Sequence, residues 1–382
     1  MNILLVQPKQ NSNVKYCESP SQALLILGTL AKQRGHEVII HHSDIDGKPN
    51  MEWADMVGIT SNTFQCRNAA ELYHEAKELD KQVVVGGPHA KYGNWNGTGV
   101  IGEGENAWLE LLGETPNIKT IDDVPWPDYS LVDIRRFAGI KLVGAYPQMA
   151  IMASRGCPYE CIFCNSPLFW GKKVRYRNPE SVVEEVQRLH IDYGINEVYF
   201  QDDTFNINHA WAEEIFRGII DKGLNKTMCF KIACRVNEKL ITKEFLDLAY
   251  KAHVWCIFLG VESGSQKMLD TMKKGITVEE SRRAIRMAKE SHIRLQASFV
   301  IGLPGENLKT LRETEQFIKN NLMYLAGASI ATPFPGTEFD RIITEKGHKK
   351  DTPYEEYQYG MCVVRTDVLD YDELRTWKFI IS

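Results

Sequence analysis

The sequence lacks the features of membrane-spanning and exported proteins. Its longest apolar runs are far too short to cross a bilayer, and no basic segment precedes the strand-like opening MNILLVQP. Fixed-period repeats and low-complexity segments are also absent, which excludes solenoid arrays and fibres. The 382 residues are 43% apolar and 25% charged, which is an ordinary globular composition and enough chain for two domains with full cores. We therefore expect a soluble, cytoplasmic protein with no membrane partner.

Charge of one sign is not in large excess. The net charge of -5 gives no broad electrostatic footprint for nucleic acid, so nucleic acid is not an expected partner. One local basic patch consists of Lys172, Lys173, Arg175 and Arg177, interleaved with Trp170 and Tyr176. We favour a solvated loop over an anion or RNA site for this patch, because charge runs are usually solvated.

The nine cysteines do not suggest a disulfide framework. An odd count without a signal sequence favours a reducing compartment. Three of them, Cys157, Cys161 and Cys164, form a CxxxCxxC triplet that supplies three thiolates to a four-iron cluster and leaves one iron without a protein ligand. That vacancy suits a cluster that binds and reduces a substrate. Structural zinc and coincidental burial are weaker alternatives, because the chain has no second CxxC and no matching HxxxH motif.

The first 113 residues alternate short β-branched runs with helical patterns, as in a parallel sheet wound with helices. The pattern predicts strands near 3–6, 37–41, 56–60, 83–86 and 100–102, and helices over 21–34 and 68–79. We interpret this region as a Rossmann-like or flavodoxin-like domain.

Residues 114–148 contain three prolines, lack clear periodicity and are interpreted as a connector. Alternation resumes with strands expected near 149–155, 196–201, 228–235, 254–260, 295–302 and 325–331. Six strand-helix units over 149–345 predict a partial barrel, and 346–382 remain as a short carboxyl-terminal tail. Its aromatic residues could line a pocket, but packing is the more common role of such residues; they are Tyr354, Tyr357, Tyr359 and Trp377.

Polar or glycine-rich residues follow the predicted barrel strands, where active sites of parallel barrels collect. They are Asp202 and Asp203, Arg235, Glu262 and Ser263, and the GLPGE turn from Gly302 to Glu306. Each of these residues could instead have a purely structural role, because acidic residues often cap helices and arginines often lie on the surface. Together they suit a ligand with an amino group, a carboxylate, a ribose and a flat base, a description that fits S-adenosylmethionine.

These motifs resemble the radical SAM superfamily over about residues 149–340. The superfamily pattern CxxxCxΦC, in which Φ is aromatic, is matched by Cys157, Cys161, Phe163 and Cys164. The resemblance implies a 4Fe-4S cluster whose free iron chelates S-adenosylmethionine and reduces its sulfonium, which releases a 5'-deoxyadenosyl radical. It also implies an external one-electron reductant such as flavodoxin or ferredoxin.

The same resemblance implies contacts to S-adenosylmethionine. The common GlyGlyGlu motif is absent, and QDDTF at 201–205 stands in its place, so Asp202 or Asp203 is expected at the amino group. Glu262, with Ser263 beside it, is expected at the ribose, and Arg235 at the carboxylate. The turn is expected at the adenine through Gly302, Pro304, Gly305 and Glu306.

The amino-terminal region resembles the superfamily subgroup that carries a cobalamin (B12)-binding-type domain. The matching motifs are SNT at 61–63, GGPHA at 86–90 and GEGE at 102–105, and possible cobalamin contacts are Ser61, Thr63, Gly86, Gly87 and His89. The DxHxxG motif that supplies an axial histidine is absent, and the comparable place reads SDIDG at 43–47. Cobalamin binding is therefore expected without a histidine ligand. His41, His42 and His89 are candidate cobalt neighbours, although structural roles are more common for such histidines.

The remaining cysteines form no further metal-spaced set, and burial is their default role. Cys17 and Cys66 follow strand ends of the first domain, so one of them could face a cofactor or substrate. The resemblance implies an enzyme whose radical acts on an unactivated carbon of a small molecule, with methyl transfer or rearrangement if cobalamin is bound. Two alternatives stay open, a tRNA methylthiotransferase-like enzyme and a redox sensor that binds the cluster and S-adenosylmethionine without catalysis.

Overall fold

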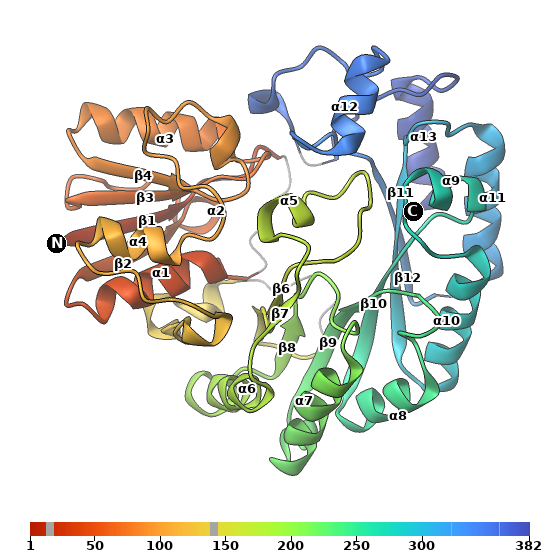
Figure 1. Cartoon of the computed structure of the whole chain (residues 1–382), viewed down its shortest axis with the longest axis horizontal. Coiled ribbons are helices and arrows are strands. Elements are labelled where there is room, and N and C mark those ends of the chain that lie inside the picture. Colours follow the sequence, from red (N-terminus) through yellow and green to blue (C-terminus); the bar gives the residue numbers. More distant parts are fainter. Residues whose placement is uncertain (13–18, 138–143, 322, 359) are drawn as a thin grey trace. The chain divides into compact units, whose positions relative to one another are not determined.

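The computed structural model describes residues 1–12, 19–137, 144–321, 323–358 and 360–382. The chain forms two compact units, which Figure 1 shows in the colours of the sequence. Unit 1 comprises Met1–Val143, Pro147–Ala150 and Thr352–Tyr359, and unit 2 comprises Gly144–Tyr146, Ile151–Asp351 and Gly360–Ser382. The segment 346–382, expected as a simple tail, is thus divided between the units.

Unit 1 contains a four-stranded parallel sheet in the order β2-β1-β3-β4. Its strands are β1 (Asn2–Gln7), β2 (Glu37–His42), β3 (Met56–Thr60) and β4 (Gln82–Gly86). The α-helices that accompany them are α1 (Gln22–Lys32), α2 (Ser43–Asp46), α3 (Cys66–Glu78) and α4 (Glu105–Leu111). Short 3-10 turns are η1 (Ala90–Tyr92), η2 (Ile121–Asp123), η3 (Tyr129–Leu131), η4 (Ile134–Arg136) and η6 (Tyr354–Glu356). This arrangement confirms the α/β prediction for the amino-terminal region.

The core of unit 1 follows from the apolar runs of these strands. Leu4, Val6, Val57 and Val85 are buried together, because strands in a parallel sheet have both faces covered. The strand predicted at 100–102 was wrong. Only an isolated bridge joins Gly99 to Val85, since Gly102 turns the chain with φ +83° before α4 begins.

Unit 2 is built around a six-stranded sheet in the order β5-β8-β9-β10-β11-β12, which is the order of the strands in the chain. These strands are β5 (Gln148–Ile151), β8 (Glu197–Phe200), β9 (Cys229–Cys234), β10 (Val254–Glu262), β11 (Arg294–Ile301) and β12 (Leu325–Ile330). A two-stranded antiparallel ribbon of β6 (Ser154–Arg155) and β7 (Arg175–Tyr176) flanks the cysteine loop. The predicted partial barrel is confirmed.

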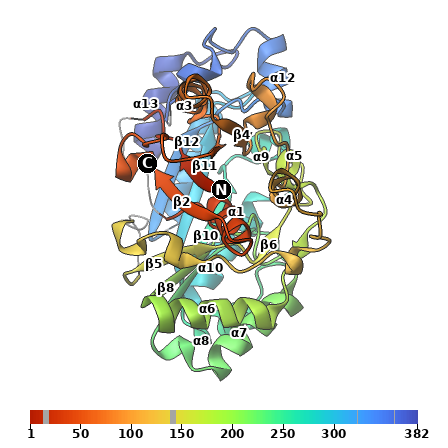
Figure 2. The ribbon, with the colours of Figure 1, turned by 90° about the vertical axis from the view of Figure 1, so that its left-hand side faces the viewer.

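Helices alternate with the barrel strands, and α6, α7 and α8 lie side by side (Figures 1 and 2). The helices are α5 (Ser166–Trp170), α6 (Pro179–Tyr193), α7 (His209–Asp221), α8 (Lys243–Lys251), α9 (Gln266–Thr271), α10 (Val278–Glu290), α11 (Leu308–Asn320), α12 (Glu338–Glu345) and α13 (Tyr371–Ile381), with one 3-10 turn, η5 (Leu224–Lys226). The limits of helix α6 are set by the residues at its ends. Asn178 accepts hydrogen bonds from the first-turn N–H groups, and Gly194 ends the helix with φ +67°.

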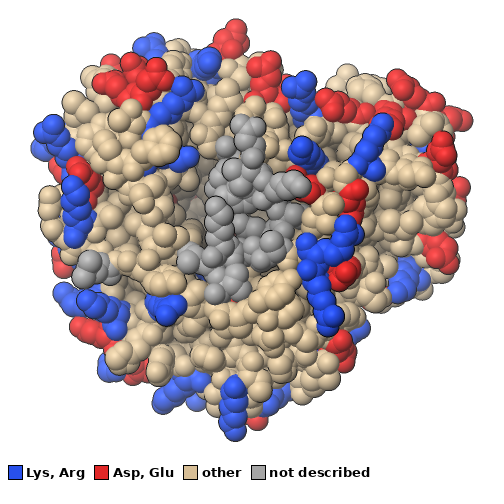
Figure 3. All heavy atoms as spheres, turned by 180° about the vertical axis from the view of Figure 1, so that it is seen from behind, with Lys and Arg blue, Asp and Glu red and all other residues tan. Residues whose placement is uncertain are grey.

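Two surface properties bear on function. Among the described residues, no helix is both long and apolar enough to cross a membrane. On the face drawn in Figure 3, acidic and basic side chains are interspersed, as the small net charge suggests.

Candidate active site

The cysteine loop between β6 and α5 is held mainly by its backbone. Ile162 is buried, its N–H donates to Met272 O (3.1 Å), and its carbonyl accepts from the Phe339 N–H (2.9 Å). The Cys164 N–H donates to Cys161 O (3.0 Å), which closes a turn. At Gly156, φ is +102° and a Cβ would overlap the Lys173 carbonyl oxygen, so only glycine fits there. The loop is therefore fixed before any ligand binds.

The three thiols of this loop form one electrostatic group. They are unpaired and partly buried. Burial, together with the charges of the neighbouring thiols and of Asp203, raises the pKa of Cys157 and raises that of Cys164 to about 12. Thiols that disfavour one another as anions need cationic compensation, which bound iron supplies.

The donor set fits a cluster better than a single ion. In the part of the chain that the structure describes, no three His, Cys, Asp or Glu side chains surround one metal position. In a 4Fe-4S cluster each thiolate binds a different iron, so three thiols in one loop need not converge on a point. The cysteine loop therefore fits the cluster expected from its spacing.

The two aspartates after β8 differ in their surroundings. Asp202 is buried, accepts hydrogen bonds from Ser154 Oγ and the Ala153 N–H, and has its pKa raised to about 6 by burial. Asp203 is exposed, accepts a hydrogen bond from Ser166, and its charge reaches Cys157 and Cys164. Asp202 fixes the start of the cysteine loop, whereas Asp203 faces it.

Arg235, at the end of β9, packs against the cysteine loop. Its guanidinium lies 3.5 Å from the centroid of the Tyr159 ring, and Nη1 is 3.9 Å from Cys161 Sγ. Asn237 Oδ1 accepts from Nε at 2.6 Å, which fixes the plane of the group. Nη2 is buried with no hydrogen-bond partner, an arrangement that suits an anionic ligand group.

Glu262 ends β10 in a strained conformation, with φ +66°. Its carboxylate accepts from Lys274 Nζ (2.7 Å) and from Ser298 Oγ (3.3 Å), and both members of the ion pair are almost buried. A side chain at Gly260 would strike this pair, since a Cβ would lie 2.5 Å from Glu262 Oε1. Ser263, by contrast, is buried and bonds to Thr314 Oγ1 (3.1 Å), on the helix α11.

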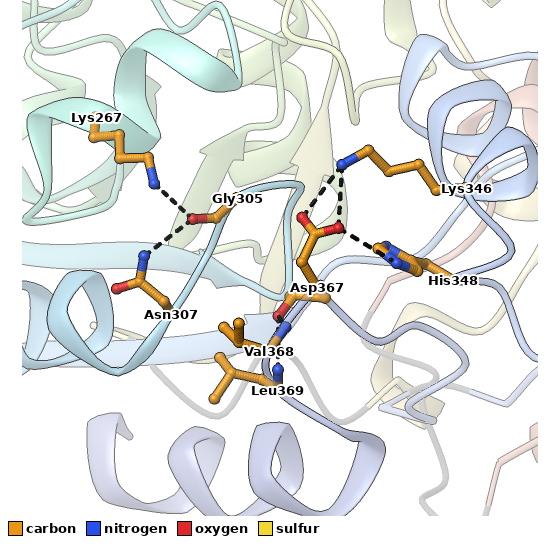
Figure 4. Close-up of polar contacts among 9 residues, drawn as sticks. Lys267, Gly305, Asn307, Lys346, His348, Asp367, Val368 and Leu369 are labelled. Carbon is orange, nitrogen blue, oxygen red and sulfur yellow. Dashed lines mark hydrogen bonds and ion pairs between the residues drawn. The ribbon is translucent and has the colours of Figure 1, made fainter.

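The turn from Gly302 to Glu306 is held by side chains on both sides. Lys267 Nζ donates to Gly305 O at 3.0 Å, and Asn307 Nδ2 donates to the same oxygen at 3.4 Å (Figure 4). Glu306 is buried, and its carboxylate accepts from the Gly302 N–H (2.8 Å) and from Thr310 Oγ1 (3.2 Å). The Glu306 carboxylate therefore holds the turn from its buried side, and Pro304 and Gly305 are its half-buried residues.

The basic patch after the cysteine loop is largely neutralised by the fold. Lys172 pairs with Glu160, and Arg177 forms a 2.6 Å ion pair with the buried Glu185. Arg175 donates to Trp170 O at 3.1 Å. Arg175 and Arg177 therefore have partners within the fold, and Arg177 is not the solvated side chain that was expected.

In unit 1, the motif residues after β3 and β4 meet at the carboxyl end of the sheet. His89 is buried, and its Nδ1 lies 3.3 Å from Thr63 Oγ1. Ser61 Oγ is buried without a hydrogen-bond partner. Gly86 has open space at its Cβ position, whereas a Cβ at Gly87 would lie 2.7 Å from Ser61 O. We call Ser61, Thr63, Gly86, Gly87 and His89 the cradle. The unpaired Ser61 hydroxyl and the open backbone at Gly86 make it a site that fits a large ligand such as cobalamin.

The other candidates in this unit have structural partners. His42 Nε2 accepts from the Ser21 N–H (3.1 Å), and burial lowers the pKa of His42 to about 4. His41 Nε2 lies 2.9 Å from Gly47 O. Cys66 is buried and donates to Thr63 O (3.2 Å), while Cys17 lies outside the described residues.

Several residues of both sites were missed by the sequence analysis. They are Ile162, Tyr159, Ser154 and Lys274 around the cysteine loop and strand ends. Tyr354 was named only as a tail aromatic that could line a pocket, and the structure places it beside His89. Lys274 lies 12 positions after Glu262, and the fold of the intervening segment brings the two together. The others contact residues distant in the chain.

Two family descriptions match separate stretches of the chain. The radical SAM superfamily matches residues 151–318, and the B12 binding domain matches residues 11–112. The fold is similar to that of the radical S-adenosylmethionine methyltransferase TsrM from Kitasatospora setae, solved with cobalamin and a 4Fe-4S cluster. The TM-score is 0.70 at 20% identity, over 92% of this chain and 76% of that chain.

Curated relatives extend over most of the chain. An uncharacterised methyltransferase of Pyrococcus horikoshii is 30% identical over 88% of this chain and 82% of its own length. The bacteriochlorophyllide d C-12(1)-methyltransferase of Chlorobaculum tepidum is 27% identical, over 93% and 81%. The anaerobic magnesium-protoporphyrin IX monomethyl ester cyclase of Cereibacter sphaeroides is 30% identical over 88% of this chain but only 60% of that longer protein.

The chain belongs to the radical SAM superfamily, in the group with an amino-terminal B12-binding domain. It is therefore an enzyme of this class, and its cofactors are a 4Fe-4S cluster, S-adenosylmethionine and cobalamin. Membership in this group does not favour the tRNA methylthiotransferase and sensor alternatives.

Proposed function

We propose that this protein methylates an unactivated carbon of a small molecule in a cobalamin-dependent radical reaction. The observation that carries the proposal is the placement of Arg235 and Asp203 at the cysteine loop, where they suit the carboxylate and amino groups of S-adenosylmethionine, within a chain that also builds a ligand cradle in unit 1. The relatives from Pyrococcus horikoshii and Chlorobaculum tepidum are named as methyltransferases, which supports methyl transfer.

Residue roles in unit 2 follow from the contacts. Cys157, Cys161 and Cys164 are the proposed cluster ligands, and Phe163 is the aromatic residue that precedes the last of them. Asp203 is preferred over Asp202 for the amino group of S-adenosylmethionine, because the carboxylate of Asp202 is already held by Ser154.

Three further groups complete the proposed S-adenosylmethionine site. The unpartnered Nη2 of Arg235 suits the ligand carboxylate, and Glu262, oriented by Lys274, suits the ribose hydroxyls. Pro304 and Gly305 offer the adenine a surface that Lys267 and Glu306 hold in place. Ser263 and Glu306 support these groups rather than touching the ligand, since their polar atoms are bonded within the fold.

In unit 1, the proposed cobalamin contacts are Ser61, Thr63, Gly86, Gly87 and His89. When bound, the cofactors supply one-electron reduction of the sulfonium and a carrier for the methyl group. The residues named above bind and orient these groups. A one-electron reductant such as flavodoxin or ferredoxin is the proposed protein partner.

The test is anaerobic incubation of reconstituted protein with cobalamin, a strong reductant and S-adenosylmethionine labelled in its methyl group. We expect the label to enter the corrin fraction and S-adenosylhomocysteine to form, in addition to 5'-deoxyadenosine. Formation of 5'-deoxyadenosine alone, with no label on cobalamin, would reject methyl transfer and favour a rearrangement or cyclisation.

A further inference from the structure

The segment from Thr352 to Gln358 belongs to unit 1, although the chain on either side of it belongs to unit 2. Tyr357 is 1% exposed, and Asn11 Nδ2 donates to the carbonyl oxygens of Tyr357 (3.1 Å) and Glu355 (3.4 Å). A segment more than 200 residues beyond the rest of its unit is thus anchored by a buried ring and by main-chain hydrogen bonds. We call residues 352–358 the returning segment.

The returning segment reaches the residues that follow β3 and β4. The Tyr354 ring meets His89 edge-on, with centroids 5.8 Å apart and planes at 72°, and Tyr357 packs against Tyr354 at 5.1 Å. Tyr92 contacts the same imidazole at 5.8 Å. The charge of Glu355 acts on both His89 and Cys66, which places it beside the same edge of the sheet.

That edge is where ligands of open parallel sheets bind, outside the carboxyl ends of the strands. It also contains the unsatisfied Ser61 hydroxyl and the open face of Gly86. Burial lowers the pKa of His89, so its ring is held neutral, with Nδ1 occupied by Thr63. The contacts of Tyr354 and Tyr92 then fix the plane in which the imidazole faces a ligand.

We propose that the returning segment is a wall of the cobalamin site and that Tyr354 is the residue that positions His89 in it. This inference rests on the proposed function, because it takes cobalamin as the ligand of unit 1. The site is then composite: its loops come from residues before 90, and its wall comes from a segment near the carboxyl end of the sequence.

The experiment measures hydroxocobalamin binding to the whole protein under anaerobic conditions, by absorption titration, together with iron per chain. We expect Tyr354→Leu to weaken binding about fivefold and to alter the corrin bands, because it removes an aromatic pair. Tyr354→Phe retains the ring and should bind as the unaltered protein does. The matched control is Tyr250→Leu, which breaks another tyrosine–histidine contact, with His292 at 6.1 Å in unit 2, and should leave cobalamin binding unchanged.

A second variant tests the same segment independently, in case Tyr354→Leu misfolds. Asn11→Ala removes the two hydrogen bonds that hold the returning segment and leaves every ring in place, so it should weaken binding in the same direction. Normal binding by both variants, in a protein that binds hydroxocobalamin, overturns the inference and leaves the proposed function standing. Failure of the unaltered protein to bind hydroxocobalamin overturns both.

Discussion

The cysteine loop of unit 2 and the cradle of unit 1 are assembled in different ways. The loop takes its three thiols from residues 157–164, and backbone hydrogen bonds to Met272 and Phe339 hold it within unit 2. The cradle joins the ends of two strands to a segment near residue 354. The proposed cluster ligands are thus contiguous in the sequence, whereas the residues around the cradle come from segments far apart in it. We therefore expect different substitutions to abolish cluster binding and cobalamin binding.

The largest expected effect breaks only the cysteine loop. Cys161→Ala removes one of the three proposed cluster ligands, so we expect loss of the iron–sulfur absorption and of 5'-deoxyadenosine formation, with hydroxocobalamin binding retained. The measurement is iron per chain and product yield after anaerobic reconstitution. Cys256→Ala, at a fully buried strand position, is the control and should retain both. Cleavage of S-adenosylmethionine by a cluster-free Cys161→Ala protein would contradict the account.

A pair of glycine variants tests the separation of the two sites directly. Gly156→Ala and Gly87→Ala each place a Cβ against a carbonyl oxygen at positive φ, which costs about 1–2 kcal/mol from the backbone alone, before any clash. We expect the first to lose iron and keep cobalamin binding, and the second to do the reverse. Gly171→Ala, which has positive φ but open space at its Cβ, controls for the backbone cost. Loss of both cofactors in both variants would show that the sites are not independent.

Within unit 2, Arg235 tests S-adenosylmethionine binding separately from cluster binding. Arg235→Ala should raise the KM for S-adenosylmethionine about 10- to 100-fold, because a buried charge-assisted hydrogen bond is lost. Steady-state 5'-deoxyadenosine formation measures it, and Arg235→Lys should recover only part of the affinity. Arg294→Ala removes a similar stack, on Tyr324 at 4.7 Å, from the start of β11. An equal rise of KM in Arg294→Ala would indicate a general loss of stability instead.

The last comparison is the dependence of stability on pH, and it concerns the turn after β11. Burial raises the pKa of Glu306 to about 7 from its usual 4.5, so the fold favours the protonated form. The stability that this group contributes is complete below pH 4.5 and is lost as the pH rises through 7, by on the order of 3 kcal/mol at most. Glu306→Gln should flatten this decline in urea unfolding at pH 5 and pH 8. The exposed Glu345→Gln is the control, and an unchanged slope in Glu306→Gln would refute the assignment.

The sequence predicted those features that local patterns encode. The strands of both sheets, the cap at Asn178 and the cysteine triplet all follow from periodicity or spacing within a few residues. The failed strand at 100–102 has the right apolar residues, but the glycines around it favour a turn.

The rest depended on contacts between distant residues. The roles of Asp202 and Asp203 were not separable, since only the fold brings Ser154 to one of them. The same is true of Tyr159 beneath Arg235, and of Tyr354 beside His89, which lies 265 positions earlier in the chain. No local periodicity reports such pairs.

The central claim, that one chain carries both a cluster and cobalamin, has one direct measurement. It is the anaerobic absorption spectrum of protein expressed with cobalamin supplied and purified with its iron. The account predicts iron–sulfur and corrin bands together, in proportions near one cluster and one corrin per chain. Iron–sulfur bands alone would contradict it and remove cobalamin-dependent methyl transfer from the chemistry of this protein.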